Sequence, residues 1–270
     1  MEKSNIDEKI KLLTGSGMWH TQEVKGLPSV HLSDGPHGLR KQEEKERQNN
    51  VSLVSTCYPT ASALACSWDV TAAERLGRAV AKEAWNADVA VLLGPGINMK
   101  RSPLCGRNFE YFSEDPFLAG RLGAAYVSAA QGEDVAVSLK HFAANNQETN
   151  RQTSNSQIDE RALREIYLSA FEYVVKTARP ATIMASYNRL NGYYACENRH
   201  LLTEILREEW GFDGVVISDW GACADLAKAV KAGMDLEMPD SHGIHARKLK
   251  AALKAGEISE EDIAKAAGRI

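Results

Sequence analysis

Charged and aromatic side chains recur directly after short apolar segments of this sequence. Asp219 and Trp220 follow the β-branched run at residues 215–218, and Lys140 and His141 follow the run that ends at Leu139. A carboxylate at the end of a buried strand is typical of the catalytic face of an α/β barrel. Similar positions after other apolar runs are taken by Asp34, Arg107, Tyr187 and Glu237.

This mixture of groups suits a ligand with many hydroxyls. Each sugar hydroxyl both donates and accepts hydrogen bonds, and charged partners form the stronger ones. Trp220 would offer a flat apolar face to the C–H side of a pyranose ring. Single residues have structural alternatives: Asp219 could cap the next helix, Arg107 could pair with Glu110 or Glu114, and His141 could be a half-buried imidazole with satisfied hydrogen bonds.

The elements that must position these residues alternate between strand-like and helix-like patterns. This alternation predicts an α/β fold, a (β/α)8 TIM-like barrel in which one strand is irregular, missing or hidden in the amino-terminal segment. Strands are expected at residues 30–33, 61–65, 89–93, 135–139, 181–185, 215–218 and 234–237. Helices are expected at residues 71–87, 116–131, 159–178, 199–209, 222–232, 245–254 and 258–270, and the charged run at 41–50 is expected to be a solvated loop.

Composition limits the classes of partner. The chain has 270 residues and a net charge of −4, so no electrostatic argument favours nucleic acid or an anionic membrane. The amino terminus is too polar for a secretory signal, and no apolar run approaches spanning length. Five cysteines without zinc-type spacing indicate reduced thiols, and we expect a cytoplasmic protein with no metal and no organic cofactor.

Five segments in order along the chain make the sequence recognisable. They are SDGPHGLR at 33–40, GRNFEYFSEDP at 106–116, KHF at 140–142, SYNRLNG at 186–192 and VISDWG at 216–221. With these segments the chain resembles the amino-terminal barrel domain of family 3 glycoside hydrolases of the β-glucosidase type. The residues after the KHF segment, Ala143-Ala144-Asn145-Asn146, differ from the Pro-Gly-His-Gly typical of the β-N-acetylglucosaminidase branch.

The resemblance implies a retaining glycosidase that releases terminal non-reducing β-D-glucosyl or related residues from a β-linked glucoside or oligosaccharide. It implies Asp219 as the nucleophile that forms the covalent intermediate. The sugar would be held by Asp34, Arg107, Lys140, His141 and Tyr187, and the ring of Trp220 would add the apolar face described above. Lys140 and Arg107 are expected to keep the Asp219 carboxylate ionised.

The general acid is the open question at this stage. In the resembled family the acid/base glutamate usually comes from a carboxy-terminal α/β sandwich domain, and we expect residues 1–270 to be a single barrel domain without it. Glu110 and Glu237 are the internal candidates, although Glu110 could instead brace Arg107 and Glu237 could pair with a lysine. Two other functions remain: a catalytically incomplete sugar-binding barrel that needs a complementing domain, and a Schiff-base aldolase that uses Lys140.

Overall fold

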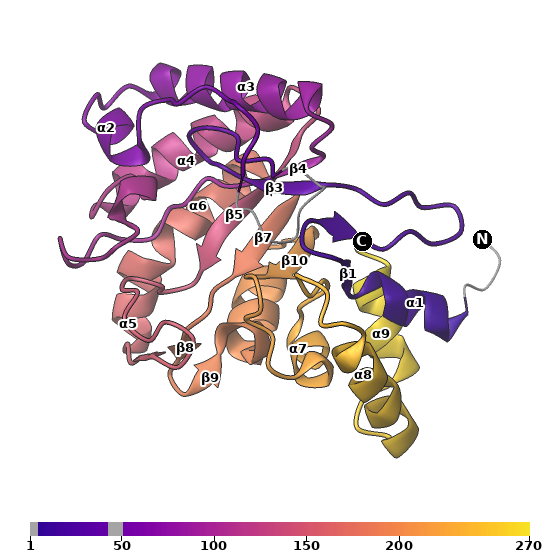
Figure 1. Ribbon diagram of the computed structural model, residues 1–270. Helices are drawn as coiled ribbons and strands as arrows, with labels where there is room; N and C mark the ends of the chain where they lie inside the picture. Colours follow the sequence, from indigo (N-terminus) through magenta and orange to yellow (C-terminus); the bar gives the residue numbers. More distant parts are fainter. Residues whose placement is uncertain (1–4, 43–50) are drawn as a thin grey trace.

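The computed structural model describes residues 5–42 and 51–270, and a parallel sheet lies at its centre (Figure 1). The hydrogen-bonded order of its strands is β10-β7-β5-β4-β3, and every neighbouring pair is parallel. Parallel neighbours need crossover connections, which helices supply here. The strands are β3 (Leu32–Asp34), β4 (Val91–Leu93), β5 (Ala136–Phe142), β7 (Thr182–Ala185) and β10 (Val215–Ser218).

Single bridges and a short hairpin continue the pairing around the barrel. Ile217 of β10 bridges Leu236, and the adjacent Glu237 bridges Thr14, both in parallel. Thr14 leads into β1 (Gly15–Ser16), which pairs antiparallel with β2 (His20–Thr21), and His20 bridges His31 just before β3. The pairings therefore run in a ring, and the fold is a TIM-like barrel. The irregular strand that the sequence analysis expected lies in the amino-terminal segment.

Side chains of the central strands alternate between two apolar layers. Val91 and Leu93 of β4 and Ile217 of β10 point into one cluster that contains Leu32, Met184, Leu236 and Met238. Leu92 and Val216 point into the larger cluster beneath the helices. Because successive strand residues face opposite sides, the first cluster fills the barrel interior and the second seals the helices to its outside.

Helices cover the outside of the sheet (Figure 1). The helices α3 (Val70–Asn86), α4 (Pro116–Gln131) and α6 (Ser169–Ala178) pack in that order, while α1 (Ile6–Leu12) packs against α8 (Ile244–Ala255) and α9 (Glu260–Ala267). Local sequence signals set where the helices begin. The Asp115 side chain accepts hydrogen bonds from two backbone amides in the first turn of α4. Pro116 occupies the first helical position, where a backbone N–H would have no partner within the helix. Asp225 caps α7 (Leu226–Ala232) in the same way.

Most predicted elements are confirmed to within four residues at each end, and one is wrong. Residues 61–65 form the helix α2 (Ala61–Ala65) rather than a strand, because Thr60 caps its start and alanine favours helix. Among the described residues, the segment 234–237 pairs through two single bridges, at Leu236 and Glu237. The predicted helix at 159–178 is divided into α5 (Glu160–Ala162), the π-helical turn η2 (Leu163–Tyr167) and α6, and that at 199–209 is the π-helix η4 (His200–Glu209).

The remaining short elements are β6 (Asn155–Ser156), β8 (Arg189–Leu190), β9 (Tyr193–Tyr194), η1 (Asn108–Glu110) and η3 (Ala195–Glu197). All five cysteines are free thiols, as expected. Within the described residues, none of the helices combines the length and the apolar character that crossing a membrane requires. Most of the charged run at 41–50, which was expected to be a solvated loop, lies outside the described residues.

Candidate active site

Asp219 lies directly after β10, at the carboxyl end of the sheet. Its Oδ1 accepts a hydrogen bond of 2.7 Å from the Trp220 amide, while its buried Oδ2 has no hydrogen-bond partner among the described residues. Burial raises the pKa of this carboxyl, and the charges of Arg107 and Lys140 act in the opposite direction. The cations are thus placed as the sequence analysis expected, but burial outweighs them.

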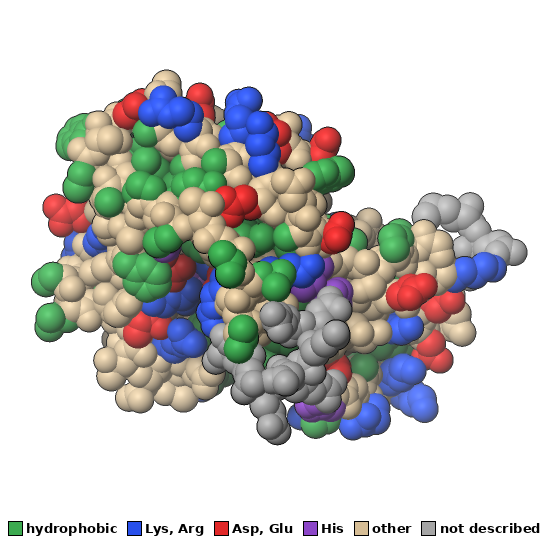
Figure 2. Space-filling view, turned by 45° about the horizontal axis from the view of Figure 1, so that its top comes forward, with side chains coloured by type: hydrophobic (Ala, Val, Ile, Leu, Met, Phe, Trp, Pro, Cys, Tyr) green, Lys and Arg blue, Asp and Glu red, His purple; other side chains and the backbone are tan. Residues whose placement is uncertain are grey.

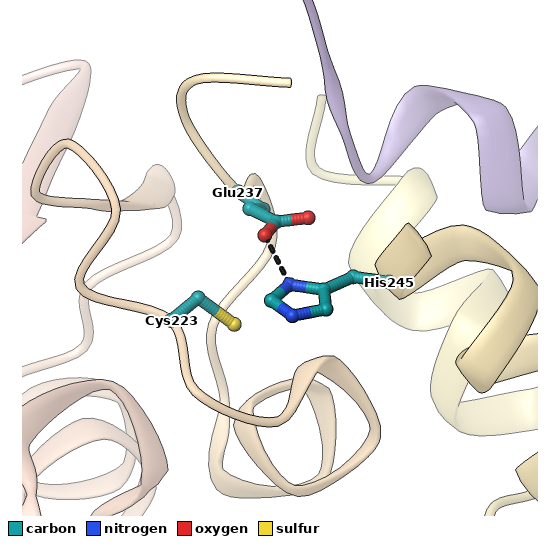
Figure 3. A group of neighbouring side chains, drawn as sticks. All are labelled: Cys223, Glu237 and His245. Atoms are coloured by element: carbon teal, nitrogen blue, oxygen red, sulfur yellow. Dashed lines mark hydrogen bonds and ion pairs between the residues drawn. The ribbon is translucent and has the colours of Figure 1, made fainter. Parts of the chain in front are cut away.

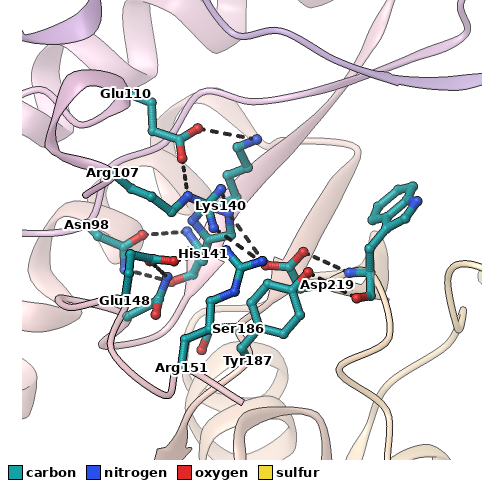
Figure 4. Close-up of polar contacts among 12 residues, drawn as sticks. Asn98, Arg107, Glu110, Lys140, His141, Glu148, Arg151, Ser186, Tyr187 and Asp219 are labelled. Atoms are coloured by element: carbon teal, nitrogen blue, oxygen red, sulfur yellow. Dashed lines mark hydrogen bonds and ion pairs between the residues drawn. The ribbon is translucent and has the colours of Figure 1, made fainter. Parts of the chain in front are cut away.

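Two cations, Arg107 and Lys140, form a network with two further carboxylates beside Asp219, and Figure 4 shows both cations with one of these carboxylates, Glu110. Arg107 is bonded through Nε to Glu110 and lies 3.9 Å through Nη1 from Asp219 Oδ2. Lys140 Nζ lies 2.8 Å from Asp34 Oδ1 and 3.5 Å from Glu110 Oε2. The alternative that Glu110 braces Arg107 is therefore confirmed.

The charge states of this network follow from the contacts. Burial acts to raise the pKa of Asp34, but the charge and hydrogen bond of Lys140 outweigh it, and the pKa is lowered. Burial acts to lower the pKa of Lys140, but Asp34 and Glu110 outweigh it, and the pKa is raised. Asp34 is therefore an anion and Lys140 a cation at neutral pH.

His141 is fully buried and hydrogen-bonded at both ring nitrogens. Arg107 Nη2 lies 2.6 Å from its Nε2, and the Tyr111 hydroxyl lies 3.0 Å from its Nδ1. Burial, Arg107 and Lys140 together lower its pKa well below the usual value, so the ring is neutral. Because a guanidinium can only donate, Nε2 accepts from Arg107, and the proton on Nδ1 is donated to Tyr111.

Consecutive residues Lys140 and His141 both reach the site because β5 is irregular there. The register of β5 against β7 shifts between Leu139 and Phe142, and such an irregularity re-aims side chains that would otherwise alternate. Asn98 fixes the backbone of this segment: its Oδ1 accepts from the His141 amide at 2.7 Å, and its Nδ2 donates to the His141 carbonyl at 2.8 Å.

Tyr187 and Trp220 form the other side of the site. The Tyr187 hydroxyl donates to the Trp220 carbonyl at 3.0 Å, and the Arg151 guanidinium lies 4.3 Å from the Tyr187 ring centroid. The Trp220 ring is half-buried, with its centroid 5.2 Å from that of Trp19. On the face in Figure 2, charged and histidine side chains lie in a hollow bordered by hydrophobic ones.

Sequence reasoning missed several members of this site. Arg151 comes from the loop after β5, and Trp19 comes from the irregular amino-terminal hairpin, so neither follows an apolar run. Arg40, whose Nη1 lies 3.9 Å from Asp34 Oδ2, stands within the motif at 33–40. Asn98 follows the glycine-rich turn after β4, and this position near a strand end could have identified it as a site residue.

Glu237 belongs to a separate cluster (Figure 3). Its carboxylate is hydrogen-bonded to His245 Nδ1 and accepts from the Ser241 hydroxyl at 3.4 Å, so its partner is a histidine rather than the lysine offered as an alternative. Cys223 completes this cluster, the group of potential metal ligands found among residues 5–42 and 51–270.

Comparisons with known proteins agree on one family. The family model described as "Glycosyl hydrolase family 3 N terminal domain" matches residues 36–270. The chain is 51% identical over 274 residues to thermostable β-glucosidase B of Acetivibrio thermocellus, covering 100% of this chain and 36% of that protein. It is also 51% identical over 242 residues to an exo-α-(1→6)-L-arabinopyranosidase of Bifidobacterium longum, covering 88% and 32%.

Solved structures show the same relationship. β-Glucosidase 3B from Thermotoga neapolitana in complex with glucose has a TM-score of 0.94 and 39% identity, covering 99% of this chain and 41% of that one. The Kluyveromyces marxianus β-glucosidase in complex with glucose has a TM-score of 0.94 and 41% identity, covering 99% and 32%. The chain thus spans about a third of the length of the curated relatives it matches.

Proposed function

Since the chain belongs to glycosyl hydrolase family 3, we propose that it is the amino-terminal barrel domain of a retaining β-glycosidase. It acts on the terminal non-reducing residue of a β-linked glucoside or oligosaccharide, through a covalent intermediate on Asp219. No metal or organic cofactor takes part in this proposed reaction.

The position of Asp219 carries this proposal. A nucleophilic carboxylate needs an oxygen that is free to attack the anomeric carbon. Oδ2 is such an atom: it is buried, unbonded, and 3.6 Å from His141 Nε2 and 3.9 Å from Arg107 Nη1. The other oxygen is fixed by the Trp220 amide, which sets the direction of attack.

The proposed sugar-binding residues surround this oxygen. Asp34, with a third of its side chain exposed, can accept from two hydroxyls while Lys140 holds it in place. Arg107 and Tyr187 supply further polar groups, His141 holds Arg107 in place through Nε2, and Trp220 supplies the apolar wall. Such preorganised charges bind hydroxyls strongly because they need not rearrange when the ligand arrives.

We propose that the general acid comes from a complementing carboxy-terminal domain. A retaining enzyme needs a second carboxyl about 5–5.5 Å from the nucleophile. Glu110 is engaged by Arg107 and Lys140, and Glu237 by His245 and Ser241. By itself the barrel would then be a catalytically incomplete sugar-binding domain.

The aldolase alternative fits the site poorly. A Schiff-base lysine attacks as the neutral amine and needs a lowered pKa. Asp34 and Glu110 raise the pKa of Lys140 against the effect of burial, which keeps it charged.

Covalent labelling tests the role of Asp219. The protein should be incubated with 2-deoxy-2-fluoro-β-D-glucosyl and 2-deoxy-2-fluoro-α-L-arabinopyranosyl donors that carry a dinitrophenyl leaving group, followed by peptide mass mapping. We expect the label on Asp219, and faster labelling as rising pH ionises a carboxyl whose pKa burial has raised. Asp34→Asn, as matched control, should still place any label on Asp219. A label on another carboxylate would remove Asp219 from this role, and the faster donor identifies the preferred sugar.

A further inference from the structure

Three side chains with metal-binding donors meet outside the proposed sugar site (Figure 3). Cys223 lies in the loop between β10 and α7, Glu237 ends the strand-like segment that bridges Thr14, and His245 lies in the first turn of α8. One donor atom from each, a thiol sulfur, a carboxylate oxygen and an imidazole nitrogen, lies within 4.8 Å of the others.

A thiol, a carboxylate and an imidazole together are the donors that bind a borderline-soft divalent cation such as zinc. Zinc is bound by thiolate sulfur at about 2.3 Å and by imidazole nitrogen or carboxylate oxygen at about 2.0–2.2 Å, in a tetrahedron. Those bond lengths place neighbouring donors about 3.4–3.6 Å apart. Glu237 and His245 are directly bonded to each other and must move apart to reach that spacing, whereas no donor atom lies more than 4.8 Å from the others.

The surroundings of Cys223 point to a ligand as well. The residue is 5% exposed, and its thiol has no hydrogen-bond partner among the described residues. Figure 3 shows its sulfur directed toward the ring of His245. The bond between Glu237 and His245 explains why those two lie together, but it gives no reason for a thiol to face them.

The other two donors are held firmly. The Glu237 amide donates to the Leu13 carbonyl at 2.9 Å, and its carbonyl accepts from the Gly15 amide at 2.9 Å. The His245 amide donates to the Ser241 hydroxyl at 3.2 Å. His245 has 16% of its side chain exposed, against 4% for Glu237, so a cation from solvent meets the imidazole first.

We propose that Cys223, Glu237 and His245 form a binding site for a zinc-class divalent cation, with solvent as the fourth ligand. Binding releases the thiol proton to solvent. The proton between His245 Nδ1 and the Glu237 carboxylate also leaves these two atoms for solvent, and bonds to the cation replace their direct bond. The cation then joins three segments: the loop after Asp219, the end of the barrel segment at Glu237, and the start of α8. It lies beside the loop that follows Asp219 and takes no part in the proposed glycosidase reaction.

Cobalt(II) is the probe, because a thiolate ligand gives it a charge-transfer absorption in the near ultraviolet. Protein freed of metal with a chelator should be titrated with Co²⁺ and then with Zn²⁺ against a chromophoric chelator. The exposed thiols Cys57 and Cys66 are first replaced by serine to remove competing sites. We expect one Co²⁺ per chain with the thiolate absorption, displaced by Zn²⁺.

Variants make the assignment specific. Removing a group that merely supports a metal ligand typically lowers affinity about 10–100-fold, so His245→Asn should lower Zn²⁺ affinity at least tenfold. Cys223→Ser should abolish the charge-transfer absorption. His242→Asn, an exposed histidine in the same segment, is the matched control and should bind as the parent does.

The proposal is overturned by any of three results: no thiolate absorption in the parent protein, the same absorption in Cys223→Ser, or unchanged Zn²⁺ affinity in His245→Asn. If Cys223→Ser fails to fold, His245→Asn decides, since its side chain lies nearer the surface.

Discussion

We expect the contact between Lys140 and Asp34 to stabilise the fold and to position Asp34 for sugar binding. Lys140 Nζ lies 2.8 Å from Asp34 Oδ1, and the lysine side chain is 3% exposed. Asp34 also has Arg40, but at 3.9 Å and with half of the arginine side chain exposed. The contributions of a close, buried cation and of a distant, exposed cation to stability can therefore be compared on the same carboxylate.

The magnitude follows from this geometry. A hydrogen bond between charged groups contributes about 1.5–3 kcal/mol. Because 32% of the Asp34 side chain is exposed, solvent screens the pair, and we take the low end, about 1.5 kcal/mol. For a chain of this size, Asp34→Asn should then lower the melting temperature by about 3–6 °C.

Two double-mutant cycles measure the contact by urea unfolding. The first combines Asp34→Asn with Lys140→Met, and we expect a coupling energy of about 1.5 kcal/mol. The second combines Asp34→Asn with Arg40→Ala, and we expect less than about 0.5 kcal/mol for that exposed pair. Since the pKa of Asp34 is lowered, the first coupling should be complete at neutral pH and should decline as pH falls below about 4.

A Lys140 coupling no larger than the Arg40 coupling would refute this reasoning. Glucose binding gives an independent readout. Loss of one charged contact to a hydroxyl, about 1.5–3 kcal/mol, lowers affinity at least about tenfold. If Asp34→Asn shows the coupling in unfolding but binds glucose unchanged in calorimetry, Asp34 supports the fold and lies outside the sugar site.

Three further predictions address the acid, the buried histidine and the surface. If the acid/base group lies in a complementing domain, the purified 270-residue chain should lose general-acid assistance of about 10²–10⁴-fold on cellobiose relative to a dinitrophenyl β-glucoside, and azide should speed turnover of the activated substrate. Brisk, azide-insensitive hydrolysis of cellobiose would instead assign the proton to an internal group such as Glu110 or Glu237. Tyr111→Phe removes the acceptor of the His141 Nδ1 proton and should cost about 1–3 kcal/mol in urea unfolding; unchanged stability would show that this proton is not donated there. His200 is hydrogen-bonded to Glu204 and Glu160, which raise its pKa, so its contribution to stability should be complete below about pH 6.5 and lost as pH rises through the raised value. An NMR titration in Glu204→Gln should move that pKa back toward its usual value, and an unmoved pKa would contradict the assigned cause.

Elements with long apolar patterns were predictable from the sequence. The strand at 215–218 and the helix at 116–131 have the predicted bounds, because a β-branched run and a capped helix with Pro116 are local signals. Residues 61–65 were wrongly predicted as a strand, because their alternation of alanine with serine and leucine resembles a strand pattern. The Thr60 hydroxyl caps the first turn and starts a helix there instead. The barrel closure at β1 and β2 has no such signal, since these strands are two residues each.

The candidate site was predictable where its residues follow strands. Asp34, Lys140, Tyr187 and Asp219 stand at strand ends, and parallel strands bring those ends to one face. Arg151 and Trp19 come from a loop and an irregular hairpin, so their proximity depends on tertiary packing alone. The cluster of Cys223, Glu237 and His245 was hidden for the same reason, because its three donors come from separate segments and show no ligand spacing.

The arrangement of charges explains how a buried carboxylate can remain available for attack. If Arg107 formed a two-pronged bond with Asp219, both carboxylate oxygens would be occupied and the proposed nucleophile would be weakened. Glu110 prevents this by bonding Arg107 Nε, while His141 takes Nη2, and Nη1 remains 3.9 Å from Asp219 Oδ2. At that distance the guanidinium still favours the charged carboxylate but leaves its lone pairs free. Glu110 therefore serves the site by restraining a cation, which is a stronger reason for its burial than a role as general acid.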